Sequence, residues 1–81
     1  MEVFTYLLKS EKSDSFYTGI TENPSKRLLE HNSGKLKTTA AKKPYKLIYT
    51  KLHSSYSEAR KHEKWLKKKN RVYKESLRKG K

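Results

Sequence analysis

The sequence predicts an α+β domain in which a three-stranded antiparallel sheet is flanked by helices, in the order ββαβα(α). Two short runs of β-branched and aromatic residues are separated by a polar turn, and a third run follows a basic segment. Two further segments begin with residues that cap helices. The 81 residues are enough for one small domain, residues 1–81.

Residues 3–8 and 16–20 are predicted to pair as a β-hairpin, because both runs are rich in β-branched and aromatic residues. The polar residues 10–15 between them fit a hairpin loop. Strands this short form a half-buried sheet that needs cover from helices.

A first helix is predicted from Asn23, which can act as N-cap, and Pro24, which suits the first helical position. The helix continues through His31 and ends near Gly34, where glycine can adopt the left-handed conformation. Residues 35–43 are then predicted to be a basic loop.

Residues 45–50 are predicted to form the third strand. Ser55 and Glu58 fit a capping box, with Ser55 as N-cap and Glu58 bonding back to its backbone N–H. This second helix is expected to run through residue 59 to about residue 68, and residues 71–78 to form a short terminal helix.

The charge is strongly positive and unevenly distributed. There are 21 Lys and Arg against 8 Asp and Glu, a net charge of +13, with a pI near 10.0. Residues 1–24 hold two lysines against four acidic residues, a net charge of −2, and the remaining +15 lies on residues 25–81. A basic tail on a neutral domain is one interpretation. A basic face that binds a polyanion, nucleic acid before an anionic membrane, is the favoured one, because the cations run through periodic segments.

Several classes of protein are excluded or disfavoured. The absence of cysteine excludes a disulfide scaffold and a thiolate metal site. The uncharged stretch 3–8 is far shorter than the roughly 20 residues that cross a bilayer. The first residues lack the pattern of a signal peptide, so a cytoplasmic protein is expected. A membrane-surface protein is disfavoured because no predicted helix pairs its basic face with a broad apolar one.

Glu63 lies on the helical stripe marked by Ala59 and Leu66, which should face the sheet. A carboxylate there is costly unless it is paired or bound to a cation. One hypothesis is an ion pair with a neighbouring lysine such as Lys67. The other is a ligand for a hard cation such as Mg²⁺, which is usually held by carboxylate, water and phosphate oxygens.

Two more pairs of residues are candidates for chemistry. Arg27 and His31 are four residues apart on one helix face, where they could clamp a phosphate and move a proton, or form a solvated basic surface. Tyr6 and Tyr17 lie on adjacent predicted strands and are expected to be near cross-strand neighbours. Such aromatic pairs ordinarily stabilise sheets.

Together these motifs resemble the GIY-YIG endonuclease superfamily, in particular its small members related to the N-terminal nuclease domain of the bacterial excision-repair C subunit. The resemblance covers about residues 3–69 and rests on the motifs Phe4-Thr5-Tyr6 and Tyr17-Thr18-Gly19, then Arg27, His31 and Glu63. Phe4 replaces the glycine of the first motif, and threonines replace the middle isoleucines, which is expected to be a packing change. Asn70 is the only candidate for an asparagine that follows the glutamate in the family.

The resemblance implies a DNA endonuclease, with links to DNA repair, that hydrolyses phosphodiester bonds with one Mg²⁺ or Mn²⁺. Glu63 would be the only protein ligand of the metal, and Arg27 would bind phosphate. One tyrosine, with Tyr6 preferred, would help to activate water, His31 would assist proton transfer, and Gly19 would allow a close approach. Nearby positive charge is expected to lower the tyrosine pKa. The proposed catalytic residues are therefore Tyr6, Tyr17, Arg27, His31 and Glu63.

The expected partner is structured DNA, bound through phosphates without strong sequence preference and with steep salt dependence. Whether RNA is also a substrate, and whether a partner protein targets the chain to its substrate, stay open. Trp65 either stacks on an unpaired base or lies in the core. The alternative function is a non-catalytic nucleic-acid-binding module with the same fold. The residues predicted to contact nucleic acid are Lys26, Arg27, Lys35, Lys37, Lys42, Lys43, Lys67, Lys68 and Arg71.

Overall fold

Strand β1 (Val3–Ser10) is the centre of the molecule, with β2 (Phe16–Thr21) on one side and β3 (Tyr45–His53) on the other. Both neighbours are antiparallel to β1. The computed structural model describes residues 2–79 and confirms the predicted fold class. Its helices are α1 (Pro24–Asn32), α2 (Lys37–Ala40), α3 (Tyr56–Lys67) and α4 (Arg71–Lys79).

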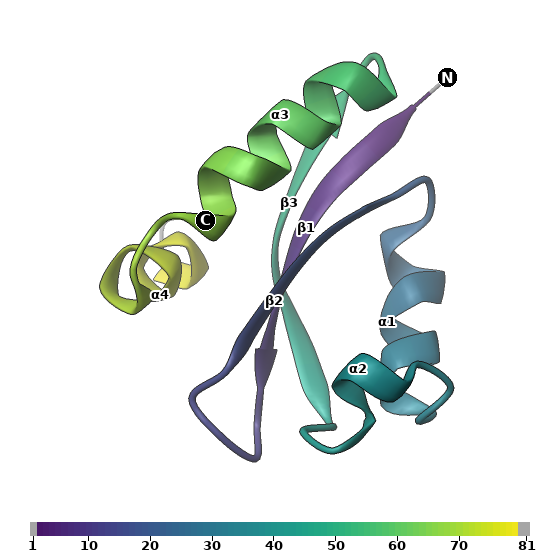
Figure 1. The fold of residues 1–81 in the computed structure, drawn as a ribbon, viewed down its shortest axis with the longest axis vertical. Helices are drawn as coiled ribbons and strands as arrows, with labels where there is room; N and C mark the ends of the chain where they lie inside the picture. The colour runs from purple at the N-terminus through teal and green to yellow at the C-terminus, as the bar shows by residue number, and fades with distance from the viewer. Residues whose placement is uncertain (1, 80–81) are drawn as a thin grey trace.

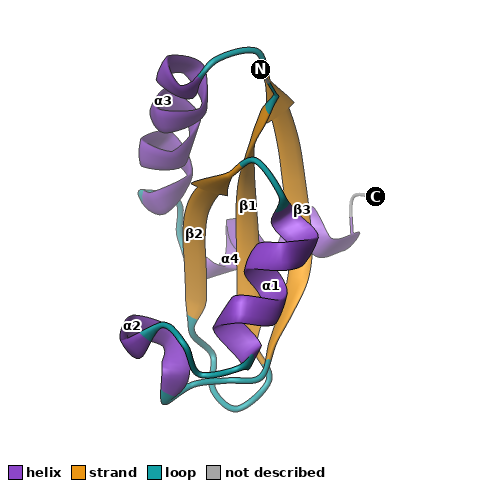
Figure 2. Cartoon of the chain, turned by 90° about the vertical axis from the view of Figure 1, so that its right-hand side faces the viewer, coloured by secondary structure: helices purple, strands orange, loops and turns teal. Residues whose placement is uncertain are grey.

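Helices cover both faces of the sheet. In Figure 1, α1 and α2 lie on one side of the strands and α3 and α4 on the other. Figure 2, turned by 90°, shows α1 in front of the strands and α4 behind them. Side chains alternate along β1, so Tyr6 and Leu8 pack toward α1 while Leu7 packs with Ile48 and Leu66 toward α3 and α4. The core is therefore two thin layers that share one strand.

The structure differs most from the predicted elements in two places, although β1 also runs two residues further than predicted, to Ser10, and β2 one residue further, to Thr21. The predicted basic loop 35–43 contains the single turn α2, in which the backbone N–H groups of Thr39 and Ala40 bond to the carbonyl of Leu36. The third strand extends to His53 because β1 pairs along its whole length, from Val3 opposite His53 to Ser10 opposite Tyr45. Both differences arise from tertiary partners that local sequence does not reveal.

The predicted caps are mostly confirmed. Asn23 Oδ1 accepts a hydrogen bond from the N–H of Lys26 at 3.1 Å, and Ser55 Oγ accepts one from the N–H of Glu58 at 3.2 Å. Gly34 has a φ of 82°, the left-handed conformation expected of it. The Glu58 carboxylate, however, accepts from the hydroxyl of Ser54 at 3.4 Å, so the reciprocal half of the capping box was predicted wrongly.

The helices are short and depend on packing for their stability. The longest helix within residues 2–79 is α3, with 12 residues, and none in that range has the length and apolarity to cross a bilayer. Leu66 is fully buried and joins α3 to Leu7 and Ile48. This single side chain therefore contributes a large share of the packing on that face.

We expect Leu66→Ala to lower the free energy of unfolding by about 2–5 kcal/mol, because it leaves a cavity in a thin core. Leu29→Ala is the matched control, since Leu29 is 70% exposed and the same atoms are removed. The control should change stability by no more than about 0.5 kcal/mol. Urea denaturation followed by circular dichroism measures both, and equal effects of the two variants would contradict this account of the core.

Candidate active site

Tyr6 lies at the centre of the candidate site, and its position depends on a glycine. It stands opposite Gly19 in the β1–β2 pairing and is 1% exposed. A Cβ atom placed on Gly19 would lie 2.7 Å from the Tyr6 hydroxyl oxygen and 2.8 Å from the ring carbon that bears it. Only glycine therefore lets the phenol ring lie against the backbone of β2.

His31 connects Tyr6 to the helical layer. Its Nε2 lies 3.0 Å from the Tyr6 hydroxyl, and its Nδ1 lies 2.8 Å from Thr39 Oγ1. The Thr39 hydroxyl donates to the carbonyl of Leu36 at 3.4 Å, so its oxygen is left to accept from Nδ1–H. This assigns the proton of neutral His31 to Nδ1 and leaves Nε2 to accept from Tyr6. Thr39 was not predicted as a site residue, because it lies in the segment expected to be a loop.

Burial keeps the two ends of this hydrogen bond uncharged. It raises the pKa of Tyr6 to about 12, outweighing the opposing effect of the Arg27 guanidinium. It also lowers the pKa of His31, and Arg27 lowers it further. Arg27 does lower the pKa of Tyr6, as expected of nearby positive charge, but desolvation is the larger effect and the net shift is upward.

Tyr17 is the more accessible of the two tyrosines. Its ring centroid lies 6.2 Å from that of Tyr6 and 4.8 Å from that of His31, so the predicted cross-strand neighbours are confirmed. Tyr17 pairs with Leu8 and is diagonal to Tyr6. Its hydroxyl makes no hydrogen bond within residues 2–79 and is not enclosed, so it is available to solvent or substrate.

Arg27 lies beside this cluster but is engaged by an acidic neighbour. Its guanidinium Nη1 is 2.8 Å from Glu30 Oε1. Hydrogen bonding to Glu30 raises the pKa of Arg27, and the same contact lowers the pKa of Glu30. Arg27 also borders an open hollow of about 400 Å³ between the end of β2, α1 and Tyr56. Glu22 and Glu30 also line the hollow, so an anion that reached Arg27 there would compete with Glu30.

Glu63 approaches the cluster from α3. Its side chain is 16% exposed and forms an ion pair with Lys67 at 3.3 Å, as the first of the two hypotheses expected. Its negative charge is near enough to Tyr6 to contribute to the raised pKa of that phenol. The structure thus brings Tyr6, Tyr17, Arg27 and His31 together, with Glu63 near enough to act electrostatically on Tyr6.

The donor set at Glu63 suits a weakly held divalent cation. Within residues 2–79 no three His, Asp or Glu side chains gather as a complete metal site. A single carboxylate fits a hard cation whose other ligands are waters and phosphate oxygens. Such a cation would bind tightly only together with its substrate.

The residues predicted to contact nucleic acid do not form one patch. The sheet separates those of α1 and α2 from those of α3 and α4 (Figure 1). Three of them are also already paired: Arg27 with Glu30, Lys67 with Glu63, and Arg71 with Asp14 at 3.1 Å. The first group comprises Lys26, Arg27, Lys35, Lys37, Lys42 and Lys43, and the second Lys67, Lys68 and Arg71.

Trp65 is not a core residue. It is 43% exposed, because Leu66 occupies the inward position of that turn and is fully buried. The core hypothesis for Trp65 was therefore wrong, and stacking on a base stays a prediction.

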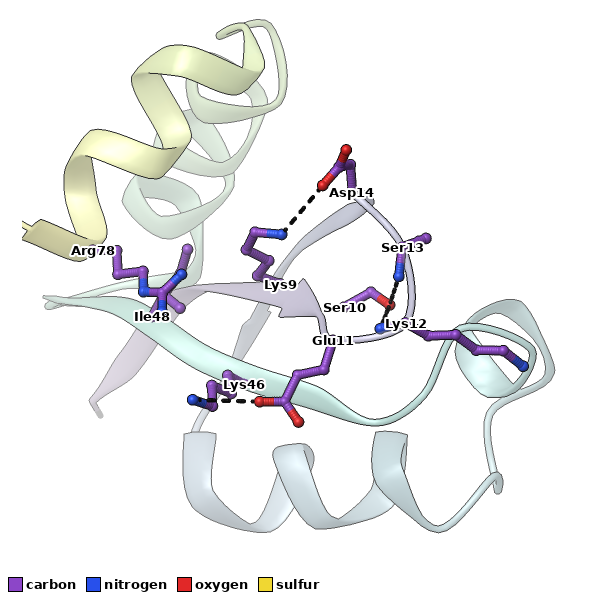
Figure 3. Close-up of a pocket in the computed structure, with 9 residues that line it drawn as sticks. All are labelled: Lys9, Ser10, Glu11, Lys12, Ser13, Asp14, Lys46, Ile48 and Arg78. Carbon is purple, nitrogen blue, oxygen red and sulfur yellow. Dashed lines mark hydrogen bonds and ion pairs between the residues drawn. The ribbon is translucent and has the colours of Figure 1, made fainter.

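A second hollow lies away from the tyrosines, at the turn of the β1–β2 hairpin (Figure 3). It has a volume of about 410 Å³ and is lined largely by charged side chains. Lys9 pairs with Asp14 at 3.7 Å, and Lys46 pairs with Glu11 at 3.4 Å. Both carboxylates of the hollow are therefore engaged by lysines, and no observation ties the hollow to the tyrosine cluster.

Comparison with known proteins identifies the family. Residues 2–76 match the family model described as the GIY-YIG catalytic domain. The chain belongs to the GIY-YIG family. It is also 42% identical over 77 residues to a UPF0213 protein of Syntrophus aciditrophicus, covering 91% of this chain and 86% of the relative.

A solved relative agrees with the fold. The solution NMR structure of the UPF0213 protein BH0048 from Bacillus halodurans is 35% identical, with a TM-score of 0.56, and the match covers 95% of this chain and 82% of that one. A UPF0213 protein of Staphylococcus haemolyticus is 41% identical over 61 residues, 74% of this chain and 73% of the relative. The chain is thus a small protein of the UPF0213 type with a GIY-YIG domain.

The departures from the GIY-YIG motifs have structural explanations. Thr5 was expected to be a packing change, but its buried hydroxyl donates to the carbonyl of Ala59 at 3.2 Å and lies 2.9 Å from His53 Nε2. Asn70 caps α4, since its Oδ1 accepts from the N–H of Tyr73 at 2.9 Å. Phe4 is half-buried on the same face of β1 as Tyr6.

Two histidines of this GIY-YIG domain, buried His31 and half-buried His62, predict a fall in stability at mildly acidic pH. Burial lowers the pKa values of His31 and His62 from about 6.5, so the unfolded chain binds protons that the folded chain does not. Stability should therefore be complete above about pH 7.5 and decline as the pH falls through 6.5. Urea unfolding at pH 7.5 and 5.5 measures this, and His31→Gln should reduce the slope. A flat profile over this range would contradict the burial of neutral imidazoles.

Proposed function

We propose that this chain is a divalent-metal-dependent endonuclease that hydrolyses phosphodiester bonds in structured DNA without strong sequence preference. The observation that carries the proposal is the Tyr6–His31 hydrogen bond next to Arg27 and Glu63, in a chain matched by the GIY-YIG catalytic domain. The net charge of +13 supports a polyanionic substrate.

Arg27 binds the non-bridging oxygens of the scissile phosphate. To do so it exchanges the carboxylate of Glu30 for the phosphate, which is an exchange of one anion for another. Glu63 exchanges the ammonium of Lys67 for Mg²⁺ or Mn²⁺ in the same way. When bound, the cation supplies charge neutralisation at the phosphate oxygens and orients the substrate.

The two tyrosines take different roles. Tyr17, whose hydroxyl is open, contacts the attacking water, although the family resemblance alone favours Tyr6 for that role. Tyr6 is enclosed and hydrogen-bonded to His31, so it fixes the imidazole, which packs 4.8 Å from the ring of Tyr17. Neutral His31 accepts the Tyr6 hydrogen bond at Nε2 and takes up the Tyr6 proton when that phenol receives one released by the attacking water.

The non-catalytic binding module is the second candidate function, and one observation favours it. Arg27 and Glu63 are both paired within the chain, and Tyr6 is a weak acid with a pKa of about 12. A protein that only binds nucleic acid would keep these pairs. Cleavage assays on DNA and RNA, with and without branches, distinguish the two functions. Cleavage by the chain alone would show that no partner protein is required for targeting.

We expect Glu63→Gln to abolish cleavage, because the amide keeps the size of the side chain but loses the anionic ligand. Nicking of supercoiled plasmid and of a branched oligonucleotide with Mg²⁺, Mn²⁺ or EDTA measures the effect. Binding of DNA in EDTA should stay within about twofold, because most affinity comes from lysine and arginine contacts with phosphates. Glu58→Gln, an exposed carboxylate on the same helix, is the matched control and should cut normally.

Cleavage by Glu63→Gln at the wild-type rate would overturn the metal-ligand assignment. Binding without cleavage by the wild type, on every substrate and with either metal, would favour the non-catalytic module.

The variants Tyr17→Phe and Tyr6→Phe distinguish the roles of the two tyrosines. Tyr17→Phe should reduce the cleavage rate by about 10²–10⁴-fold and leave stability unchanged, because its hydroxyl has no partner within residues 2–79. Tyr6→Phe should also destabilise the protein by about 1–3 kcal/mol, since His31 Nε2 then loses its buried donor. Single-turnover cleavage and urea denaturation measure both effects. Full activity of Tyr17→Phe would return the water-activating role to Tyr6.

A further inference from the structure

Four aromatic side chains form a ladder across β3, α3 and α4. The ring centroids are 6.0 Å apart between Tyr49 and His62, 5.1 Å between His62 and Trp65, and 5.7 Å between Trp65 and Tyr73. The ring of Trp65 is stacked on His62 at 24° and meets Tyr73 edge-on at 87°. The tyrosine hydroxyl of Tyr49 lies 3.0 Å from His62 Nε2 and fixes the inner end.

The outer end of this ladder is exposed. Trp65 and Tyr73 are 43% and 36% exposed, although burying these rings would enlarge the thin core. The indole is held in one orientation by His62, and a base that stacks on its exposed part would displace the Lys69 ammonium to a phosphate of the same strand. Stacking on an exposed ring is the contact that single-stranded nucleic-acid sites use, because every base offers a flat face.

Lysines surround the exposed rings. The Lys69 ammonium lies 4.7 Å from the ring centroid of Trp65 and 5.6 Å from that of Tyr73. Along the outward face of α3, residues at helical spacing are exposed and form no ion pair with any carboxylate of residues 2–79. These residues are Lys61, Lys64 and Lys68.

We infer that Trp65, Tyr73 and Lys69 form a stacking site for an unpaired base of the nucleic-acid substrate. The three lysines of the outward face bind the phosphates of the same strand. Aromatic faces next to unpaired cations match the alternating bases and phosphates of a single strand better than they match a membrane or a protein surface. The inference rests on the proposed function for the position of the reacting phosphate.

The geometry of α3 relates this stacking site to the candidate active site. Glu63 and Trp65 are two residues apart and so project about 200° apart around the helix axis. Lys64, between them, lies on the outward crest. A strand that passes over this crest therefore follows roughly half the circumference of the helix, about 17–21 Å, from Glu63 to Trp65. The substrate is thus a DNA with an unpaired segment within a few nucleotides of the cut, such as a flap or a single-stranded tail.

The test uses the fluorescence of Trp65, which is the only tryptophan in the chain. The probes are an oligothymidylate of about 12 nucleotides and a blunt duplex of the same length, both in EDTA. We expect the single strand to quench the fluorescence and the duplex to quench it much less. By fluorescence anisotropy of labelled DNA, Trp65→Ala should bind the single strand about 5–150-fold more weakly, the range expected for one lost stacking contact.

Three controls define the contact. Trp65→Phe keeps a ring and should recover most of the affinity, while Val72→Ala, which removes an apolar side chain that is 77% exposed on α4, should leave it unchanged. Lys64→Ala should reduce the salt dependence of single-strand binding by about 0.7 in the log–log slope. Circular dichroism confirms that each variant is folded.

The inference is overturned if Trp65→Ala binds the single strand as tightly as the wild type, or if the duplex quenches as strongly. Equal quenching by polyglutamate would also overturn it, because the contact would then be one of charge alone. No cutting occurs in EDTA, so failure here is distinct from failure of the Glu63→Gln experiment. An inactive protein can still bind the single strand, and an active one can fail to quench.

Discussion

The close approach of the Tyr6 ring to the backbone of Gly19 is the contact on which the rest of the structure depends. Because Gly19 has no Cβ, the phenol can lie against β2 and its hydroxyl can reach His31 of α1. His31 then bonds to Thr39 of α2, so one buried chain of hydrogen bonds joins the sheet to two helices. Within residues 2–79 no buried side-chain nitrogen or oxygen lacks a partner. The fold and the candidate site are held by the same interactions.

Each charged group of the candidate site is neutralised by a neighbour that resembles what it would bind. The Glu30 carboxylate is paired with Arg27, at the position where a phosphate would bind. The Lys67 ammonium is paired with Glu63, at the position where a divalent cation would bind. In each ion pair both residues lie on the same helix. The pairs therefore form at a low cost in side-chain entropy, and they are only partly buried. If the proposed phosphate and metal replaced them, the Glu30 carboxylate and the Lys67 ammonium would be released, and solvent would have to take the place of their partners.

Local sequence predicted the features that depend on local chemistry. The caps at Asn23 and Ser55, the turn at Gly34 and the neighbouring tyrosines follow from short-range rules and are confirmed. The turn α2 and the role of Thr39 could not be predicted, since they depend on a histidine eight residues earlier that the fold encloses. The direction of the Tyr6 pKa shift also required the structure, because it depends on how completely the ring is buried rather than on which charges are nearby.

Two adjacent residues of β1 set the distance between the two halves of the candidate site. Successive side chains of a strand point to opposite faces. Tyr6 therefore bonds to His31 in the layer that carries Arg27, while Thr5 bonds to the carbonyl of Ala59 in the helix that carries Glu63. The helices that carry Arg27 and Glu63 are thus both anchored to one buried dipeptide of the central strand. A threonine in place of an isoleucine exchanges apolar contact for a directed bond, which fixes the position of α3 where a short helix could otherwise slide.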